Sequence, residues 1–314
     1  MVRLFRFREV VFVCCCAFLA ALSGHAQAQT KLRMLSYNVL HGFRGEDERK
    51  TAFVEWVQKI DPDIVAFQEL NGFSQNDLTE LARRYGHRYS VIMNAEFGVP
   101  VTHPLAITSR YPILNTQRVM DDMWHGYLYA TVQGVHIFVT HLAPFTVEDR
   151  IKDIEKIIAQ AQTIPRNDVV IIAGDMNALS PRDSVHYGET LLASMQRIEG
   201  RLEPKSGESI VRGRTIYRNN LKNGRVDYSV ITKLLDAGYA DAFYETHTAF
   251  VNSVPSSGHA GGKSIKRRID YIFVRKTPGV SIAKADILQD KITASLSDHY
   301  PVLVDLALIE FPEE

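Results

Sequence analysis

The sequence predicts an α/β fold, because short apolar segments typical of buried strands alternate with segments of helical periodicity along most of the chain. Residues 64–67 and 169–173 are continuous apolar runs, as in strands that are covered on both faces. Between them, residues 147–158 repeat apolar side chains every three or four positions, which indicates an amphipathic helix. A chain of 314 residues is long enough to bury one large core.

The remaining elements follow in order along the chain. Residues 53–60 have helical spacing and end at an Asp-Pro-Asp turn, and a further helix is expected around residues 78–82. Residues 234–238 resemble a helix end capped by glycine. Residues 198–226 are rich in Gly, Asn, Arg and Lys, and we expect a long surface excursion there. The expected strands cover residues 32–39, 64–67, 89–93, 105–109, 127–132, 136–140, 169–173, 269–274, 281–288 and 300–308.

Residues 1–28 have the pattern of a secretory signal peptide. A start with three arginines precedes an apolar run over residues 10–22, and the Ala26-x-Ala28 spacing suits signal peptidase. A membrane anchor is the alternative, but a helix over residues 10–22 would span only about 20 Å of a bilayer core of about 30 Å. We therefore expect cleavage near Ala28, a single domain over residues 29–314 with no transmembrane segment, and a secreted or periplasmic protein.

The composition excludes several classes of protein. The 36 Lys and Arg residues are balanced by 36 Asp and Glu residues, which excludes a strongly basic nucleic-acid binder of the histone kind. With 46% hydrophobic residues, the chain is neither disordered nor fibrous. All three cysteines lie within residues 14–16, inside the predicted signal peptide, so the mature chain can form neither disulfides nor thiolate metal sites.

Polar side chains stand at the ends of four expected strands. An ionised carboxylate at the edge of an apolar core costs several kcal/mol unless it is paired or binds a cation. One such residue is usually a cap or a salt-bridge partner, whereas four similar strand ends indicate a shared site outside the strand termini. These residues are Asn38, Glu69, Asp175, Asn177, Asp298 and His299.

Carboxylate and amide oxygens without cysteine suit a hard cation, Mg²⁺ or Mn²⁺, better than a structural zinc ion. Mg²⁺ usually keeps water ligands that a substrate phosphate can displace. A hard cation beside histidines such as His141 and His299 therefore indicates phosphate-ester hydrolysis.

Six short motifs, read in chain order, carry a resemblance to a known family. They are Ser36-Tyr37-Asn38, Gln68-Glu69, Thr140-His141-Leu142, Gly174-Asp175-Met176-Asn177, Arg268-Ile269-Asp270-Tyr271 and Ser297-Asp298-His299. In these motifs and their order, which span residues 36–299, the sequence resembles the endonuclease/exonuclease/phosphatase superfamily. The resemblance implies a DNase I-like fold, a four-layer α/β/β/α sandwich with two facing mixed β-sheets.

The resemblance also implies a role for each site residue. Asn38, Glu69 and Asp298 would surround the metal. Asp175 and Asn177 would orient or activate the attacking water and hold the phosphate, and Asp175 is a further candidate metal ligand.

Three other residues complete the implied machinery. His299 would act as acid/base or phosphate contact with its ring oriented by Asp270, and His141 would donate to a non-bridging or leaving oxygen. These assignments have structural alternatives. Asn38 could start a turn, Asp270 could pair with Arg267 or Arg268, and His141 or His299 could be an ordinary buried side chain. His41 and Arg110 are candidate pocket residues for which a structural role is equally compatible.

The leading hypothesis is a secreted Mg²⁺- or Mn²⁺-dependent hydrolase of phosphate esters, a nuclease-like phosphodiesterase or a phosphatase, acting as a monomer. Nucleic acid is one candidate partner, which a basic rim would favour. The alternatives are a lipid phosphodiesterase of the sphingomyelinase or phospholipase C kind on the same fold, and a non-catalytic binding module. The rim residues would be Arg212, Arg214, Arg218, Lys222, Arg225, Lys263, Lys266, Arg267 and Arg268.

Overall fold

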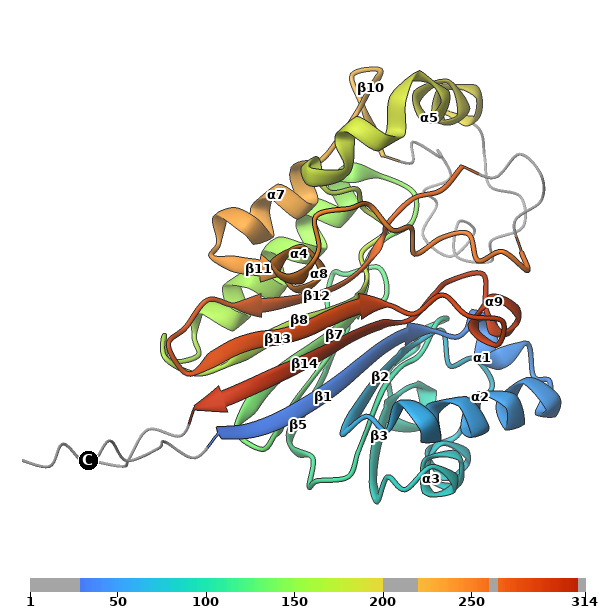
Figure 1. Ribbon diagram of the computed structural model, residues 1–314, viewed down its shortest axis with the longest axis vertical. Helices are drawn as coiled ribbons and strands as arrows, with labels where there is room; N and C mark the ends of the chain where they lie inside the picture. The colour runs from blue at the N-terminus through green and yellow to red at the C-terminus, as the bar shows by residue number, and fades with distance from the viewer. Residues whose placement is uncertain (1–28, 200–219, 260–264, 310–314) are drawn as a thin grey trace, which may run out of the picture.

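Two facing six-stranded β-sheets form the centre of the protein in a computed structural model that describes residues 29–199, 220–259 and 265–309 (Figure 1). The first sheet contains, in spatial order, β13 (Val280–Ile287), β14 (Val302–Ile309), β1 (Gln29–Asn38), β2 (Ile64–Gln68), β4 (Leu105–Ser109) and β3 (Tyr89–Met93). The second contains β11 (Tyr239–Asp241), β12 (Asp270–Arg275), β8 (Val170–Asp175), β7 (Val135–His141), β6 (Tyr127–Val132) and β5 (Leu114–Val119). Both sheets are mixed, since β1–β2 and β7–β8 pair in parallel and the other neighbours pair antiparallel.

Helices cover the outer face of each sheet. Apolar side chains of α2 (Asp47–Ile60) and α3 (Gln75–Arg84) pack on β1 and β2, and those of α4 (Val147–Gln162) and α7 (Ser229–Asp236) pack on the second sheet (Figure 1). The four-layer α/β/β/α sandwich predicted from the sequence is therefore confirmed. The other elements are α1 (Leu40–Phe43), η1 (Ala95–Phe97), η2 (Pro181–Asp183), α5 (Ser184–Ile198), β9 (Leu221–Lys222), β10 (Arg225–Val226), α8 (Ala242–Thr246) and α9 (Thr293–Leu296).

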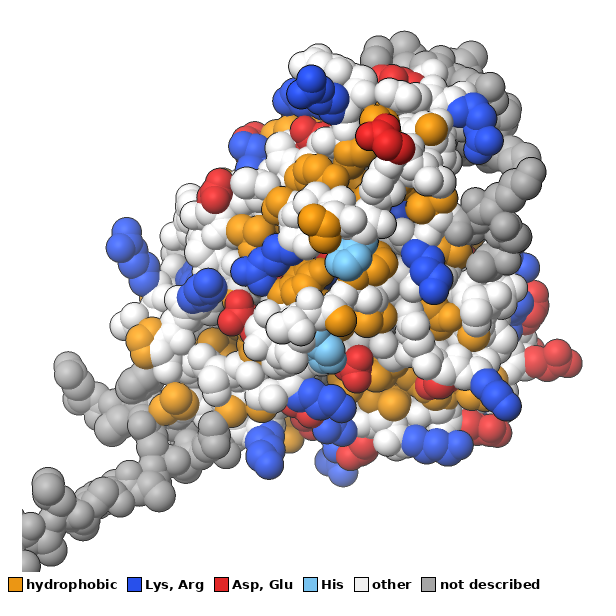
Figure 2. Space-filling view, turned by 45° about the horizontal axis from the view of Figure 1, so that its top comes forward, with side chains coloured by type: hydrophobic (Ala, Val, Ile, Leu, Met, Phe, Trp, Pro, Cys, Tyr) orange, Lys and Arg blue, Asp and Glu red, His pale blue; other side chains and the backbone are white. Residues whose placement is uncertain are grey.

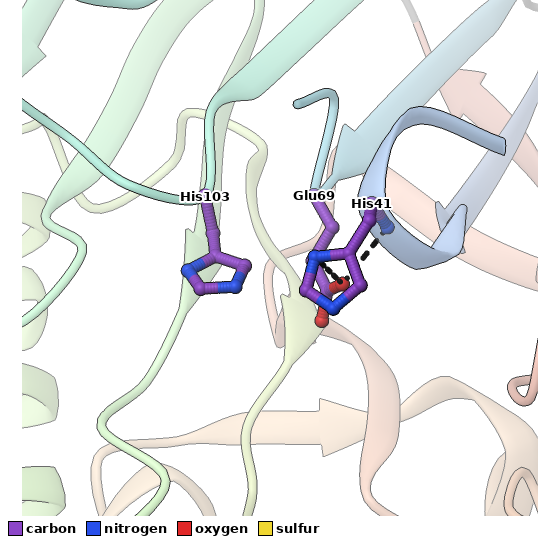
Figure 3. A group of neighbouring side chains, drawn as sticks. All are labelled: His41, Glu69 and His103. Atoms are coloured by element: carbon purple, nitrogen blue, oxygen red, sulfur yellow. Dashed lines mark hydrogen bonds and ion pairs between the residues drawn. The ribbon is translucent and has the colours of Figure 1, made fainter. Parts of the chain in front are cut away.

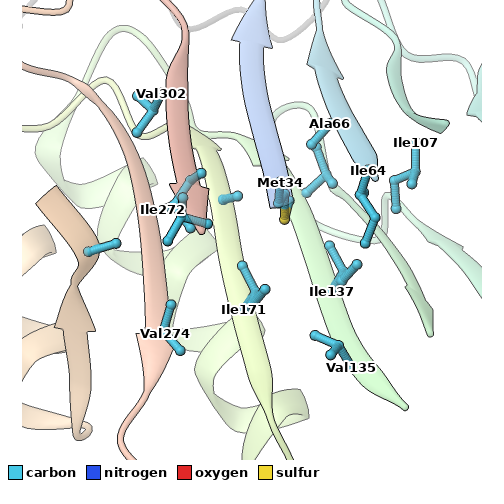
Figure 4. Packing of buried hydrophobic residues seen from close by; sticks show 14 of the residues in the cluster. Met34, Ile64, Ala66, Ile107, Val135, Ile137, Ile171, Ile272, Val274 and Val302 are labelled. Atoms are coloured by element: carbon cyan, nitrogen blue, oxygen red, sulfur yellow. The ribbon is translucent and has the colours of Figure 1, made fainter. Parts of the chain in front are cut away.

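The largest apolar core lies between the two sheets. Met34, Ile64 and Ile107 of the first sheet meet Ile137 and Ile171 of the second (Figure 4). Because alternate residues of a strand share a face, the inward positions of β1 and β8 continue from apolar side chains to polar ones at the strand ends. The same alternation brings polar side chains inward on β2, β7 and β12. These inward polar residues are Asn38, Gln68, His141, Asp175 and Asp270.

The sequence predicts most of these elements, and the exceptions are short or partly exposed, except for the 15-residue helix α5. It predicts no strand over residues 114–119 or 239–241, and no helix over residues 184–198, 242–246 or 293–296. Strand β5 is half exposed, with Leu114 on the surface, so it lacks the buried apolar run that marks the other strands.

Two other expectations concern the ends and loops of the chain. The predicted signal peptide and residues 200–219 of the predicted surface excursion lie outside the described residues, whereas residues 221–226 form the β9–β10 hairpin. In the part of the chain that the structure describes, each helix is too short or too polar to cross a membrane.

Candidate active site

The ends of β1 and β2 in the first sheet and of β7, β8 and β12 in the second meet at one edge of the inter-sheet core. His141 is the register partner of Asp175 in the parallel pair β7–β8, and Asp175 is the partner of Asp270 in the antiparallel pair β8–β12. Register partners point to the same face of a sheet, so three polar side chains stand side by side and face inward. Strand pairing thus places five of the six motifs within the two sheets, and the loop with Ser297, Asp298 and His299 joins them through hydrogen bonds to Asn38 and Asp270.

Asp175 is the centre of this cluster and joins the two sheets. Its Oδ2 accepts a hydrogen bond from Asn38 Nδ2 at 3.2 Å, and the same amide nitrogen donates to Glu69 Oε1 at 3.0 Å. Its Oδ1 accepts from the backbone N–H of Asn177 at 2.8 Å. The Nε2 atoms of His141 and His299 lie 3.4 and 3.8 Å from Oδ2.

Unusual backbone conformations place three of the motif residues. Glu69 has φ of 60° and Asn177 has φ of 46°, so the chain turns sharply as it leaves β2 and β8. Gly174 has φ of 140°, and a Cβ there would lie 1.9 Å from the carbonyl oxygen of Thr140. Glycine is therefore required for β8 to approach β7 closely at the site.

His299 is held in one orientation by two contacts. Its Nδ1–H donates to Asp270, at 2.9 Å from Oδ2 and 3.1 Å from Oδ1, which turns Nε2 toward Asp175 and Asp298. Ser297 Oγ donates to the carbonyl oxygen of Asn38 at 2.7 Å and accepts from the His299 N–H at 3.1 Å. The loop that carries Asp298 and His299 is thereby fixed to the end of β1.

The charges of this cluster shift two pKa values. Burial raises the pKa of Asp175 to about 7, aided by the negative charges of Asp270 and Glu69 and opposed by His299 and the Asn177 N–H. Burial works against the charged form of His299, but the carboxylates of Asp270, Asp298 and Asp175 outweigh it and raise its pKa well above the ordinary histidine value. The carboxylates around His299 therefore favour its protonated imidazole.

The donor set fits a hard divalent cation. In the described residues, the ion pairs of Glu69, Asp175, Asp270 and Asp298 all involve histidine side chains. Burial is the main cause of the raised pKa of Asp175, and the negative charges of Asp270 and Glu69 add to it; a divalent cation would offset both effects. Oxygen atoms from three or more carboxylates and the Asn38 amide match the ligands that Mg²⁺ and Mn²⁺ prefer.

A row of histidines lines one side of the cluster, and two of its members, His103 and His125, belong to none of the six motifs. The ring centroids of His125 and His141 lie 4.4 Å apart, those of His103 and His125 lie 5.0 Å apart, and those of His41 and His103 lie 5.3 Å apart. His125 Nδ1–H also donates to the carbonyl oxygen of His141 at 3.0 Å. His103 and His125 each precede a strand by two residues, and Asp298 and His299 likewise lie just ahead of a strand, four and three residues before β14.

The structure brings His41 to the site but not Arg110. The backbone N–H of His41 donates to Glu69 Oε2 at 3.1 Å. Arg110 follows β4, whose last residue pairs with the first residue of β2, so it lies at the far end of the sheet. There it forms ion pairs with Asp61 and with Asp63, the latter at 3.8 Å.

The arginine of the fifth motif has a structural environment of its own. Arg268 is buried and pairs with Asp183 and Asp241, so Asp270 is paired with His299 and not, as the structural alternative had it, with Arg268. Of the proposed basic rim, Arg212, Arg214, Arg218 and Lys263 lie outside the described residues. On the face shown in Figure 2, Lys and Arg side chains are interspersed with Asp and Glu.

The comparisons with known proteins agree with this geometry. The family model described as the Endonuclease/Exonuclease/phosphatase family matches residues 35–299, from the end of β1 to His299. The chain belongs to the endonuclease/exonuclease/phosphatase family. Members of this family are phosphoester hydrolases, and the six motifs at the site all lie within the matched range. No curated protein matches the sequence significantly.

Solved structures of the family share the fold at low sequence identity. An endonuclease/exonuclease/phosphatase from Bacteroides vulgatus superposes with a TM-score of 0.61 at 17% identity, over 89% of this chain and 99% of that chain. An AP endonuclease from Archaeoglobus fulgidus gives a TM-score of 0.59 at 16% identity, over 89% and 100%. A 3′ phosphatase from Neisseria, solved with a product DNA hairpin, gives 0.59 at 17% identity, over 89% and 100%.

Proposed function

We propose that this protein is an exported phosphodiesterase that depends on Mg²⁺ or Mn²⁺ and cleaves phosphate diesters, nucleic acid among them. One observation carries the proposal: strand ends of both sheets bring Asn38, Glu69 and Asp175 into direct hydrogen-bond contact beside the His299–Asp270 pair. Family membership supports hydrolysis of phosphate esters. The Neisseria relative solved with product DNA supports nucleic acid as a substrate class.

Asn38, Glu69 and Asp298 would hold the cation, as the resemblance implies. When bound, the cation would neutralise charge on the substrate phosphate and polarise its P–O bonds. Asp298 has a side chain 42% exposed, so it stands where substrate and solvent can reach the cation.

The protein's own residues supply the proton transfers and the orientation. Asp175, fixed by the Asn38 amide and the Asn177 N–H, is placed to accept a proton from the attacking water. The carboxylates around His299 favour its protonated form, and its Nε2 is placed to donate a proton to a phosphate oxygen as negative charge develops there. Asp270 holds the ring of His299, and His141 contributes a second imidazole on the other side of Asp175.

A comparison of two aryl phosphates tests the reaction type. Metal-free protein should release p-nitrophenol from bis(p-nitrophenyl) phosphate after addition of Mg²⁺ or Mn²⁺, and much more slowly from p-nitrophenyl phosphate. Linear DNA, RNA and sphingomyelin tested in parallel rank the natural substrate classes. An Asp175→Ala variant that keeps full diesterase activity, or a wild-type protein equally active in EDTA, would contradict the proposal.

Export rests on the sequence of residues 1–28 and has its own test. The protein recovered from a secreting bacterial host should begin at Gln29 when its N-terminus is sequenced. Recovery of the chain with Met1 intact in the cytoplasm would contradict export and leave the proposed chemistry untouched.

A further inference from the structure

A second group of candidate metal ligands lies beside the catalytic cluster. His41 follows β1 on α1, Glu69 follows β2, and His103 precedes β4, so three chain segments contribute one side chain each (Figure 3). Each offers one ligand atom, and these atoms all lie within 4.8 Å of one another. In Figure 3 the three side chains approach a common space from two sides.

The distances suit a metal ion after small side-chain movements. Metal–nitrogen and metal–oxygen bonds of about 2.1 Å place neighbouring ligand atoms about 3.0–3.5 Å apart. His41 Nδ1 already lies 3.6 Å from Glu69 Oε2. His103 Nδ1 is hydrogen-bonded to Thr102 Oγ1 at 3.0 Å, the kind of outer contact that orients a metal-binding imidazole.

The two oxygens of Glu69 face two different groups. Oε1 accepts from Asn38 on the side of Asp175, whereas Oε2 accepts from the backbone N–H of His41 on the histidine side. One carboxylate can therefore serve both the hard-cation site of the proposed function and a separate site formed with the histidines.

The backbone around His41 is shaped to keep its imidazole beside Glu69. Leu40, His41, Phe43 and Arg44 all have φ between 48° and 59°, a left-handed run that non-glycine residues rarely adopt. Gly42 within this run cannot take a Cβ, which would lie 2.1 Å from the carbonyl oxygen of Asn71. The turn fixes the chain against the loop after β2, where Glu69 lies.

We propose that His41, Glu69 and His103 form a second metal site, specific for a borderline divalent ion of the Zn²⁺ class. Two imidazoles and one carboxylate are a ligand set typical of zinc sites that keep open positions, whereas Mg²⁺ prefers oxygen ligands. The side chain of His41 is 57% exposed, so the remaining positions face solvent and the substrate. The proposal goes beyond the proposed function and shares only Glu69 with it.

Binding of Co²⁺, a spectroscopic substitute for Zn²⁺, tests the site without any activity measurement. Titration of the metal-free protein should give visible d–d absorption from one Co²⁺ that Zn²⁺ displaces and excess Mg²⁺ does not. His41→Ala and His103→Ala should each weaken Co²⁺ binding by more than roughly 100-fold, because loss of an outer contact alone costs 10–100-fold. Asp298→Asn, which alters the hard-cation site, should retain the absorption.

Two histidines outside the site provide matched controls. His186 is exposed like His41 and stacks on Phe250, so His186→Ala should bind Co²⁺ like the wild type. His247 is hydrogen-bonded through Nδ1 to Thr246 Oγ1 at 3.0 Å, the same arrangement as at His103, so His247→Ala controls for that variant. Equal Co²⁺ affinity in wild type, His41→Ala and His103→Ala, or no Co²⁺ binding, would overturn the second site. That result would leave the proposed Mg²⁺-dependent diesterase activity untouched, because the aryl phosphate assay tests it separately.

Discussion

Replacement of Arg268 by methionine should destabilise the whole domain although it touches no reacting group. The guanidinium is 1% exposed; its Nε donates to Asp183 Oδ2 at 2.9 Å and its Nη1 to Asp241 Oδ1 at 3.0 Å. It also lies over the rings of Tyr244 and Tyr271, 4.7 and 4.5 Å from their centroids. Methionine fills much of the same volume but leaves two buried carboxylates without a cation.

The expected loss follows from burial of these two charges. Removal of one partner from a buried ion pair costs about 3–5 kcal/mol, because the remaining charge is uncompensated. Here two carboxylates lose the same partner, so the upper part of that range applies. Burial already raises the pKa of Asp183 with Arg268 present, which agrees with a costly environment. At roughly 2–4 °C per kcal/mol, the melting temperature should fall by roughly 10 °C or more.

Urea unfolding followed by circular dichroism measures this loss. The midpoint of Arg268→Met should fall while the slope of the transition stays constant. Adding Asp183→Asn and Asp241→Asn to Arg268→Met removes the stranded charges and should recover at least half of the lost free energy. A loss below about 1 kcal/mol for Arg268→Met, or a triple variant less stable than the single one, would refute the reasoning.

Three further predictions follow from single contacts. Asp270→Asn weakens the charge-assisted hydrogen bond that orients His299, which is worth about 1.5–3 kcal/mol. The kcat/KM for the diester should therefore fall roughly 10–100-fold, and the ring ¹⁵N chemical shifts of His299 should change. An unchanged rate would exclude a positioning role for Asp270. Gly174→Ala should cost more than about 3 kcal/mol in urea unfolding, since its Cβ would meet Thr140 O at 1.9 Å; wild-type stability would show that the strands can separate there. Burial lowers the pKa of His87 to about 4. Below pH 6.5 this histidine therefore binds a proton in the unfolded chain but not in the native protein. The free energy of unfolding should fall by about 3 kcal/mol between pH 6.5 and 4, and His87→Gln should reduce this pH dependence. Parallel pH profiles of unfolding free energy for the two proteins would contradict this prediction.

The sequence was enough to find the centre of the site because its residues end apolar strands. Asn38, Asp175 and Asp270 follow or begin buried runs on inward positions. Strand pairing brings Asp175 and Asp270 together, and the packing of the two sheets brings Asn38 to Asp175. The resemblance of their motifs to one family implied the four-layer arrangement of two facing sheets, which periodicity does not contain. The fold and the carboxylate cluster could therefore both be predicted.

What the sequence could not supply was the direction of strands and the path of loops. Arg110 follows a strand, as Glu69 does, but β4 runs antiparallel to β2 and carries it to the opposite end of the sheet. His103 and His125 stand singly in turns before β4 and β6, with no spacing that relates them. Only the packing of the two loops places their rings beside His141.

The central claim is that acidic and amide side chains from both sheets bind one hard cation that drives diester hydrolysis. The most direct measurement is the initial rate of bis(p-nitrophenyl) phosphate hydrolysis as a function of Mg²⁺ concentration, for the wild type and Asp298→Asn. We expect a saturable Mg²⁺ dependence in the wild type and at least a roughly tenfold higher Mg²⁺ requirement in Asp298→Asn. A wild-type rate that does not change with Mg²⁺, or two identical curves, would contradict the account.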